Sequence, residues 1–169
     1  MTLEKLIGEH LPVPPERQQI LQKHLRRVKW LRRLQEVSNA EKVKLKTIET
    51  LAREGAQIGD SRLTAEVAMV NEQLARCKEW SEEQNKSSLE SNGEIRRLLE
   101  IGQRTLKFEL DDYVDLKNFY RDTCAWRKTT KKILTQGHRI PELTSEFLKK
   151  HIDEGRNQLA IDDKETTLL

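Results

Sequence analysis

The residues that could carry out chemistry are few and widely separated in this sequence. Its four histidines are far apart: His10, His24, His138 and His151. The chain has no Cys-x-x-Cys pair, no phosphate-binding glycine loop and no nucleophile elbow. The adjacent carboxylates Asp111-Asp112 fit a helix start, and Asp162-Asp163 fit a solvated tail. We therefore expect no catalytic, metal or cofactor site, and no enzymatic activity, in this chain alone.

Positive charge is concentrated near the N-terminus. Residues 1–53 carry 12 Lys/Arg and 6 Asp/Glu, whereas the whole chain has a net charge of only +3. Five cations lie close to Trp30: Arg26, Arg27, Lys29, Arg32 and Arg33. A cationic helix with an aromatic residue among its charges could bind the phosphates of a nucleic acid. The alternative is a solvated helix face whose long side chains cover apolar surface.

A helical arrangement of these residues separates the charges from the tryptophan. In such a helix Arg26, Lys29 and Arg33 project together, whereas Trp30 turns toward the core. The two hypotheses for the cationic stretch therefore differ in whether this shared face contacts phosphates or only water. The sequence leaves both open.

Glycine and tryptophan recur at similar intervals along the chain. Four glycines are spaced 47, 47 and 53 residues apart: Gly8, Gly55, Gly102 and Gly155. The three tryptophans follow the preceding glycine by 22, 25 and 24 residues: Trp30, Trp80 and Trp126. Such a period is typical of helical arrays. We predict that each glycine is a left-handed C-terminal cap of a short helix, and that each tryptophan anchors a long helix in the core.

The predicted fold is all-α, an elongated array of short-helix/long-helix pairs with a period of about 47 residues. One domain over residues 1–162 would contain units at about 2–37, 40–90, 93–136 and 141–162, followed by a frayed tail at 163–169. The expected long helices run from Pro15 to about Val37, from Asp60 or Ser61 through Trp80, and from Asp111 or Asp112 to Gln136. The expected short helices include 2–10, about Ala40 to Glu54, and Gly93 to Ile101, the last followed by an apolar crossing through Leu106, Phe108 and Leu110.

The composition indicates in which cellular compartment the protein resides. The chain has no run of eighteen apolar residues and no apolar N-terminal signal segment, so we expect neither a membrane span nor secretion. Each of the two cysteines precedes a tryptophan inside a helical pattern: Cys77 and Cys124. We expect both to be reduced core residues of an intracellular protein.

One stretch resembles a known family. The sequence LLEIGQRTLKFEL at 98–110, followed by Cys-x-Trp at 124–126, is similar to the PLU-type helical region of the Lid family. Those chromatin proteins combine JmjN, ARID, JmjC, zinc-finger and PHD modules and demethylate the fourth lysine of the histone H3 tail. The similarity covers about residues 40–162, with 2–30 a weaker copy. Three prolines in the first crossing and Gly59 in the second depart from the pattern.

The resemblance implies a nuclear helical module that spaces or docks the catalytic, histone-reading and corepressor parts of a histone H3 demethylase-type protein. The parent could be an Fe(II)/2-oxoglutarate-dependent demethylase or an inactive fungal relative, and its catalytic residues would lie outside this segment. Other domains or subunits of a chromatin complex are the expected partners, without a cofactor and without a membrane. Two alternatives remain: a weak accessory DNA or nucleosome contact through the cationic helix, and a spectrin-like cytoskeletal segment. Which protein docks, and the oligomeric state, stay open.

Overall fold

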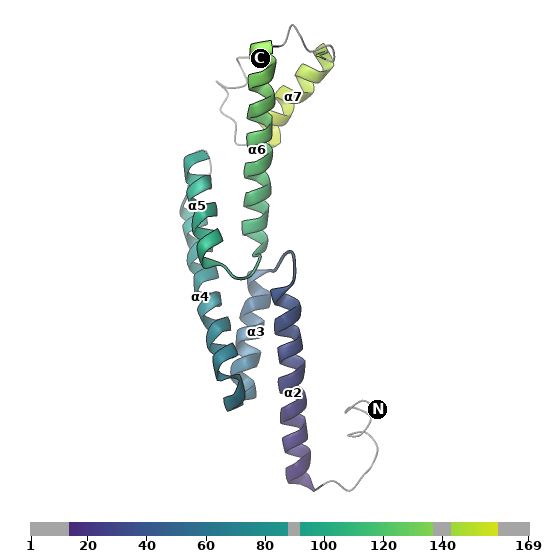
Figure 1. The fold of residues 1–169 in the computed structure, drawn as a ribbon, viewed down its shortest axis with the longest axis vertical. Coiled ribbons are helices and arrows are strands. Elements are labelled where there is room, and N and C mark those ends of the chain that lie inside the picture. Colours follow the sequence, from purple (N-terminus) through teal and green to yellow (C-terminus); the bar gives the residue numbers. More distant parts are fainter. Residues whose placement is uncertain (1–13, 88–91, 137–142, 159–169) are drawn as a thin grey trace. The chain divides into compact units, whose positions relative to one another are not determined.

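The protein is a helical chain in the computed structural model, which describes residues 14–87, 92–136 and 143–158. The elements in chain order are α2 (Pro15–Ser38), α3 (Leu45–Ile58), the 3-10 helix η1 (Ser61–Leu63), α4 (Thr64–Lys86), α5 (Asn92–Thr105), α6 (Asp111–Gln136) and α7 (Ser145–Gln158) (Figure 1). Helices account for 87% of the described residues, which contain no strand. The predicted all-α fold class is therefore confirmed.

Some predictions concern residues outside these ranges. They are the short helix at 2–10 with Gly8, the connection at 137–142 and the tail at 163–169. These features stay predictions.

The long helices begin where local signals place them. Pro15 occupies the first turn of α2, where its missing N–H is no loss. Asp60 caps η1, which leads directly into α4, because its side chain accepts a hydrogen bond from the Arg62 backbone N–H. Asp111 is the first residue of α6. These starts agree with the predicted positions.

The helix α3 starts later than predicted, at Leu45 instead of about Ala40. The reason is an isolated parallel bridge between Val43 and Leu110. The Val43 N–H donates to the Glu109 carbonyl at 2.8 Å, and the Asp111 N–H donates to the Val43 carbonyl at 2.9 Å. The bridge holds Val43 in an extended pairing and Lys44 after it is extended too, so the helix begins only at Leu45.

The crossing between α5 and α6 is non-helical, as predicted, and two of its three apolar residues are buried. Phe108 is 3% exposed and Leu110 is fully buried. The buried Gln73 side chain of α4 also holds this segment, because its Oε1 accepts a hydrogen bond from the Lys107 N–H at 2.8 Å. Side-chain burial and backbone pairing together fix the crossing.

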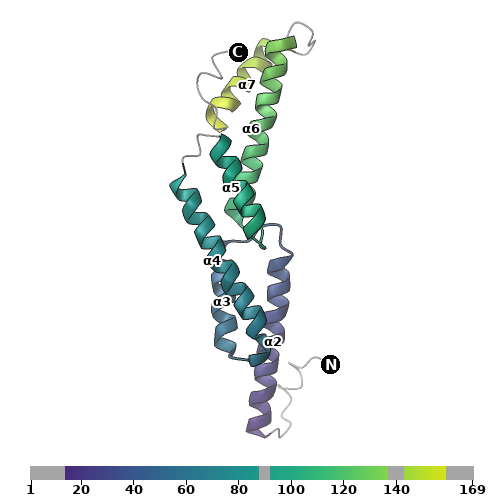
Figure 2. The same ribbon diagram turned by 60° about the vertical axis from the view of Figure 1, so that its left-hand side comes forward.

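The chain divides into two compact units. The first consists of the residues up to Lys78 together with Leu106–Asp111, and the second of Glu79–Thr105 together with the residues from Asp112 onward. In the first unit α2 lies beside α3, and in the second α7 lies beside α6 (Figures 1 and 2). The single repeat domain predicted for residues 1–162, with its four units, stays a prediction.

The two cysteines occupy different environments. Cys77 is fully buried in α4, and burial raises the pKa of its thiol to about 11. Cys124 is exposed, so the expectation of a core residue is wrong there. It precedes the buried Trp126 by two residues, which is about 200° around a helix, and it therefore points away from the core. Among the described helices, none is long and apolar enough to span a membrane.

Candidate functional site

Each tryptophan lies against a glycine of the next short helix in the chain. The three pairs are Trp30 with Gly55, Trp80 with Gly102, and Trp126 with Gly155. All three indoles are buried, and each donates its Nε1–H to the backbone carbonyl four residues before the glycine. The acceptors are the carbonyls of Leu51 at 2.9 Å, Leu98 at 2.9 Å and His151 at 2.7 Å.

These hydrogen bonds need no break in the accepting helix. A carbonyl oxygen has two lone pairs, and the helical ladder uses one of them, so the second can accept the indole N–H. A buried indole N–H without a partner would cost about 1–3 kcal/mol. The hydrogen bond therefore fixes the position of each indole along the axis of the neighbouring helix, in addition to holding it against the glycine.

The glycines allow close approach and are not helix caps. Gly55, Gly102 and Gly155 lie inside α3, α5 and α7, and among the described residues only Gly59, the C-cap of α3, has a positive φ, of 57°. A Cβ atom at Gly55 would lie 2.7 Å from Trp30 Cζ2. The predicted left-handed cap role is therefore wrong for these three glycines, because each lies inside a helix where an aromatic ring excludes a side chain.

Residues of the following long helix complete two of the contacts. A Cβ at Gly55 would lie 3.0 Å from Val67 Cγ2, and a Cβ at Gly102 would lie 2.5 Å from Tyr113 Cε2. The sequence analysis did not single out Val67 or Tyr113. Their similar spacing could have identified them from the sequence, because they follow their glycines by 12 and 11 residues.

The structure divides the five candidate cations into two groups. Arg26, Lys29 and Arg33 line a hollow of about 380 Å³ between α2 and α3, next to Trp30. The α3 residues that line the hollow are Glu54, Gln57 and Ile58. Arg27 and Arg32 are not among its lining residues.

Arg33, Arg32 and Arg27 each pair with a carboxylate of the chain itself. Arg33 Nη1 lies 2.7 and 2.6 Å from the two carboxylate oxygens of Glu54. The Arg32 Nε donates to Glu36 at 3.1 Å, one helical turn away. Arg27 Nη1 lies 3.6 Å from Asp60 Oδ2. A phosphate that bound all five cations would have to compete with these pairs.

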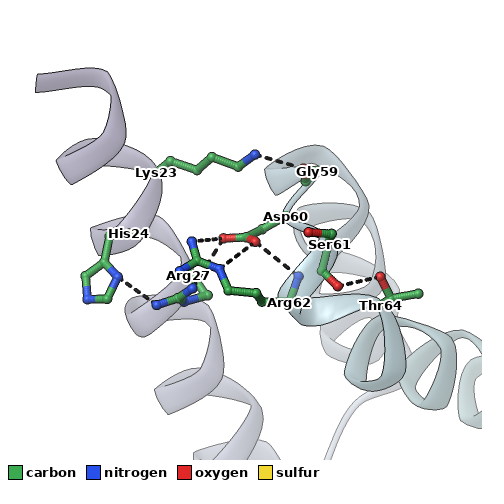
Figure 3. Close-up of polar contacts among 8 residues, drawn as sticks. All are labelled: Lys23, His24, Arg27, Gly59, Asp60, Ser61, Arg62 and Thr64. Carbon is green, nitrogen blue, oxygen red and sulfur yellow. Dashed lines mark hydrogen bonds and ion pairs between the residues drawn. The ribbon is translucent and has the colours of Figure 1, made fainter. Parts of the chain in front are cut away.

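The carboxylate of Asp60 is the centre of a second polar cluster (Figure 3). Its side chain is 4% exposed and accepts hydrogen bonds from three nitrogens of Arg62: the backbone N at 3.1 Å, Nε at 3.0 Å and Nη2 at 2.9 Å. Because Arg27 comes from α2, its ion pair with Asp60 fastens that helix to the turn between α3 and α4.

One further contact holds the same turn, and another braces Arg27 within α2. Lys23 Nζ donates to the Gly59 carbonyl at 3.0 Å, and Arg27 Nη2 donates to His24 Nδ1 at 2.7 Å (Figure 3). A guanidinium has no acceptor, so His24 Nδ1 must be unprotonated in this contact. The polar groups of this cluster are paired with one another within the chain. We therefore interpret the cluster as a structural contact between α2 and the turn that follows α3.

The Asp60 cluster predicts that part of the protein's stability is lost at acidic pH. Side-chain and backbone hydrogen bonds from Arg62 lower the pKa of Asp60 from 3.8 to about 2, and the charges of Arg62 and Arg27 add to this effect. A folded pKa below the unfolded one gives stability that is present above pH 4 and lost as the pH falls toward 2. We expect thermal unfolding curves of the wild type and Asp60→Asn to converge over this window. A melting-temperature gap that is constant from pH 7 to pH 2 would contradict the assignment.

The buried His151 is also explained by packing. Its ring stacks on Trp126 with centroids 4.7 Å apart, and its Nε2 lies 2.8 Å from Thr130 Oγ1. Burial lowers the pKa of His151, and the charge of Glu154 opposes this shift. His151 and Asp153 have a His-x-Asp spacing, but the described residues contain no group of three or more His, Cys, Asp or Glu placed to hold a metal ion.

The hollow beside Trp30 is thus the candidate interaction site. Its charged side chains reach the surface, whereas the Asp60 cluster and the tryptophan contacts are taken up by the packing of the helices. No protein-family model matches the chain, and neither a curated protein nor a solved structure matches it.

Proposed function

We propose that this chain is a helical scaffold and protein-interaction module. The observation that carries the proposal is the tryptophan–glycine contact, which recurs in three helix pairs with the same hydrogen bond. Each contact fixes both the distance and the register between a long helix and the next short one. In its finer form the proposal is an array of short-helix/long-helix pairs with a period of about 47 residues. Such an array suits a protein that holds other parts at set spacings.

The proposed setting is chromatin, and it rests on the resemblance of about residues 40–162 to the Lid family. In that setting the module lies in the nucleus, in a histone H3 demethylase-type protein or an inactive relative. It spaces the catalytic and histone-reading domains or docks corepressor subunits. The chemistry would belong to other parts of that protein.

The setting can be tested by proximity labelling. The chain, carrying a biotin ligase, is expressed in cells of its own organism, and the labelled proteins are identified. We expect chromatin proteins to dominate, and we expect Trp80→Ala/Trp126→Ala, which breaks two helix contacts, to lose them. A set of neighbours dominated by cytoskeletal proteins would overturn the chromatin setting and favour the spectrin-like alternative.

A DNA or nucleosome contact remains the second candidate. The observation in its favour is that Arg26, Lys29 and Arg33 line one hollow. The contact of Arg33 Nη1 with both carboxylate oxygens of Glu54 counts against it, because that carboxylate lies where phosphates would approach. We therefore place the scaffold role first.

A further inference from the structure

We propose that the contact between α6 and α7 is an acid-sensitive latch, in which protonation of the buried His151 loosens α7 from Trp126. This inference concerns the regulation of one helix contact, and it does not depend on the chromatin setting. Loosening of α7 would uncover the indole of Trp126, which is 4% exposed in the closed contact. The surface that the module offers to a partner would then depend on pH.

The three tryptophan contacts differ in one side chain. The residue whose carbonyl accepts the indole N–H is a leucine in two of them, Leu51 in α3 and Leu98 in α5, and these side chains are 0% and 2% exposed. In the third contact this residue is His151 of α7, which is 6% exposed. The same geometry therefore forms with an apolar side chain or with an imidazole. Only the imidazole can take up a proton at mildly acidic pH.

The imidazole of His151 lies between two aromatic rings. Its centroid is 4.7 Å from that of Trp126 and 5.9 Å from that of Phe147, and both interplanar angles are 10°. Its Nε2 lies 2.8 Å from Thr130 Oγ1, a hydroxyl that can either donate or accept. A proton on this ring would therefore place a positive charge in a setting from which most water is excluded.

The neighbouring charges oppose this cost only in part. The charged residues that line the hollow containing His151 are Asp122 of α6 together with Lys150 and Glu154 of α7. Asp122 is paired with Arg121 at 3.0 Å. Burial is the largest effect and lowers the pKa of His151 below its ordinary value of 6.5, although the charge of Glu154 opposes the shift. The faces of the two aromatic rings also attract a cation, and this attraction too is smaller than the effect of burial.

The direction of the pKa shift determines how pH acts on the contact. The ring of His151 binds a proton more readily when α7 is released, so the contact is strongest above the unfolded pKa of 6.5. It weakens as the pH falls below that value, and the opening equilibrium rises by at most about tenfold for each pH unit. The Asp60 carboxylate responds only below about pH 4, so the two effects occupy separate pH ranges.

The helix α7 is also less enclosed than the other two short helices. Seven positions before the glycine, Ile48 of α3 and Ile95 of α5 are fully buried, whereas Leu148 of α7 is half-buried. The three atoms nearest to a Cβ at Gly155 all belong to Trp126, whereas at the glycines of α3 and α5 a residue of the following long helix is among them. A helix with fewer buried contacts opens locally at a lower cost in free energy. We therefore expect acid to release α7 without unfolding the rest of the chain.

Hydrogen exchange of the three indole N–H groups measures the three contacts separately in the full chain. Each group is hydrogen-bonded to the neighbouring short helix, so its protection relative to free tryptophan at the same pH reports how often that contact opens. Between pH 7.5 and pH 5.5 we expect the protection of Trp126 to fall by up to about tenfold. The protection of Trp30 and Trp80, whose contacts contain leucine, should stay constant.

Two substitutions test whether the ring of His151 is the cause. His151→Leu introduces the side chain of the other two contacts, and His151→Gln keeps a polar side chain that does not titrate. Both should make the protection of Trp126 independent of pH over this range. The matched control is His24→Gln, which removes the histidine beside Arg27 in α2 and should leave the response of Trp126 unchanged. Circular dichroism at both pH values checks that each variant keeps its helix content.

Three results would overturn the proposal. They are a constant protection of Trp126 in the wild type, a fall that persists in the His151 variants, and an equal fall at all three indoles, which indicates global unfolding. A response that disappears in His24→Gln would assign the acid sensitivity to α2 instead. None of these results depends on which proteins are labelled in cells, so this proposal and the chromatin setting fail separately.

Discussion

Replacing Trp80 by alanine is expected to lower the free energy of unfolding by about 3–5 kcal/mol, the range for removing a buried tryptophan. Trp80 is 2% exposed and donates its indole N–H to the Leu98 carbonyl at 2.9 Å. Its ring also meets Tyr113 edge on, with centroids 5.7 Å apart. The substitution removes apolar contact area, a buried hydrogen bond and an aromatic contact at once. Urea denaturation followed by circular dichroism measures the loss.

Two control variants assign that loss to the contact. Trp80→Phe keeps most of the apolar volume but removes the N–H, so we expect a smaller loss. The Leu98 carbonyl keeps its helical partner in this variant and is not left unsatisfied. Leu134→Ala, on the exposed surface of α6, should change the free energy of unfolding by less than about 0.5 kcal/mol. A Trp80→Ala variant as stable as Leu134→Ala would contradict the packing.

The second large effect is expected at Gly55. In an exposed helix interior, a change from glycine to alanine stabilises by about 1 kcal/mol. Here the added Cβ would lie 2.7 and 2.9 Å from ring carbons of Trp30 and 3.0 Å from Val67 Cγ2. Because both neighbours are packed side chains, we expect Gly55→Ala to destabilise by about 1–3 kcal/mol. The sign of the change in unfolding midpoint is the measurement.

A double-mutant cycle shows whether the indole is the cause. Phenylalanine lacks the part of the indole that would touch the new methyl group. We therefore expect Gly55→Ala to cost less in a Trp30→Phe background than in the wild type, with a coupling of about 0.5–3 kcal/mol. Strict additivity of the two substitutions would show that the glycine is required for another reason.

Helix starts and helix content could be read from the sequence because the signals are local. Pro15 and Asp111 act through their own backbone and side chains, and both begin helices where they were expected. The start of α3 could not be read in this way. It depends on Val43 pairing with Leu110, a residue that only the folded chain brings near.

The role of the glycines could not be predicted from the sequence either. Spacing identified Gly55, Gly102 and Gly155 as special, but spacing does not tell a cap from a point of close approach. That difference depends on what lies over the glycine, and each is covered by aromatic rings from other helices. Local propensity therefore suggested a cap, whereas tertiary packing required the absence of a side chain.

The candidate site likewise has one part that the sequence predicts and another part that depends on the tertiary structure. The sequence by itself determined a cationic helix around Trp30, because the charged residues and the helical period are both local features of the residue order. Only the tertiary structure decided which cations line the hollow, and that Arg33 and Arg27 are tied to carboxylates. Glu54 and Asp60 come from beyond α2, and electrostatic pairing depends on distance in space.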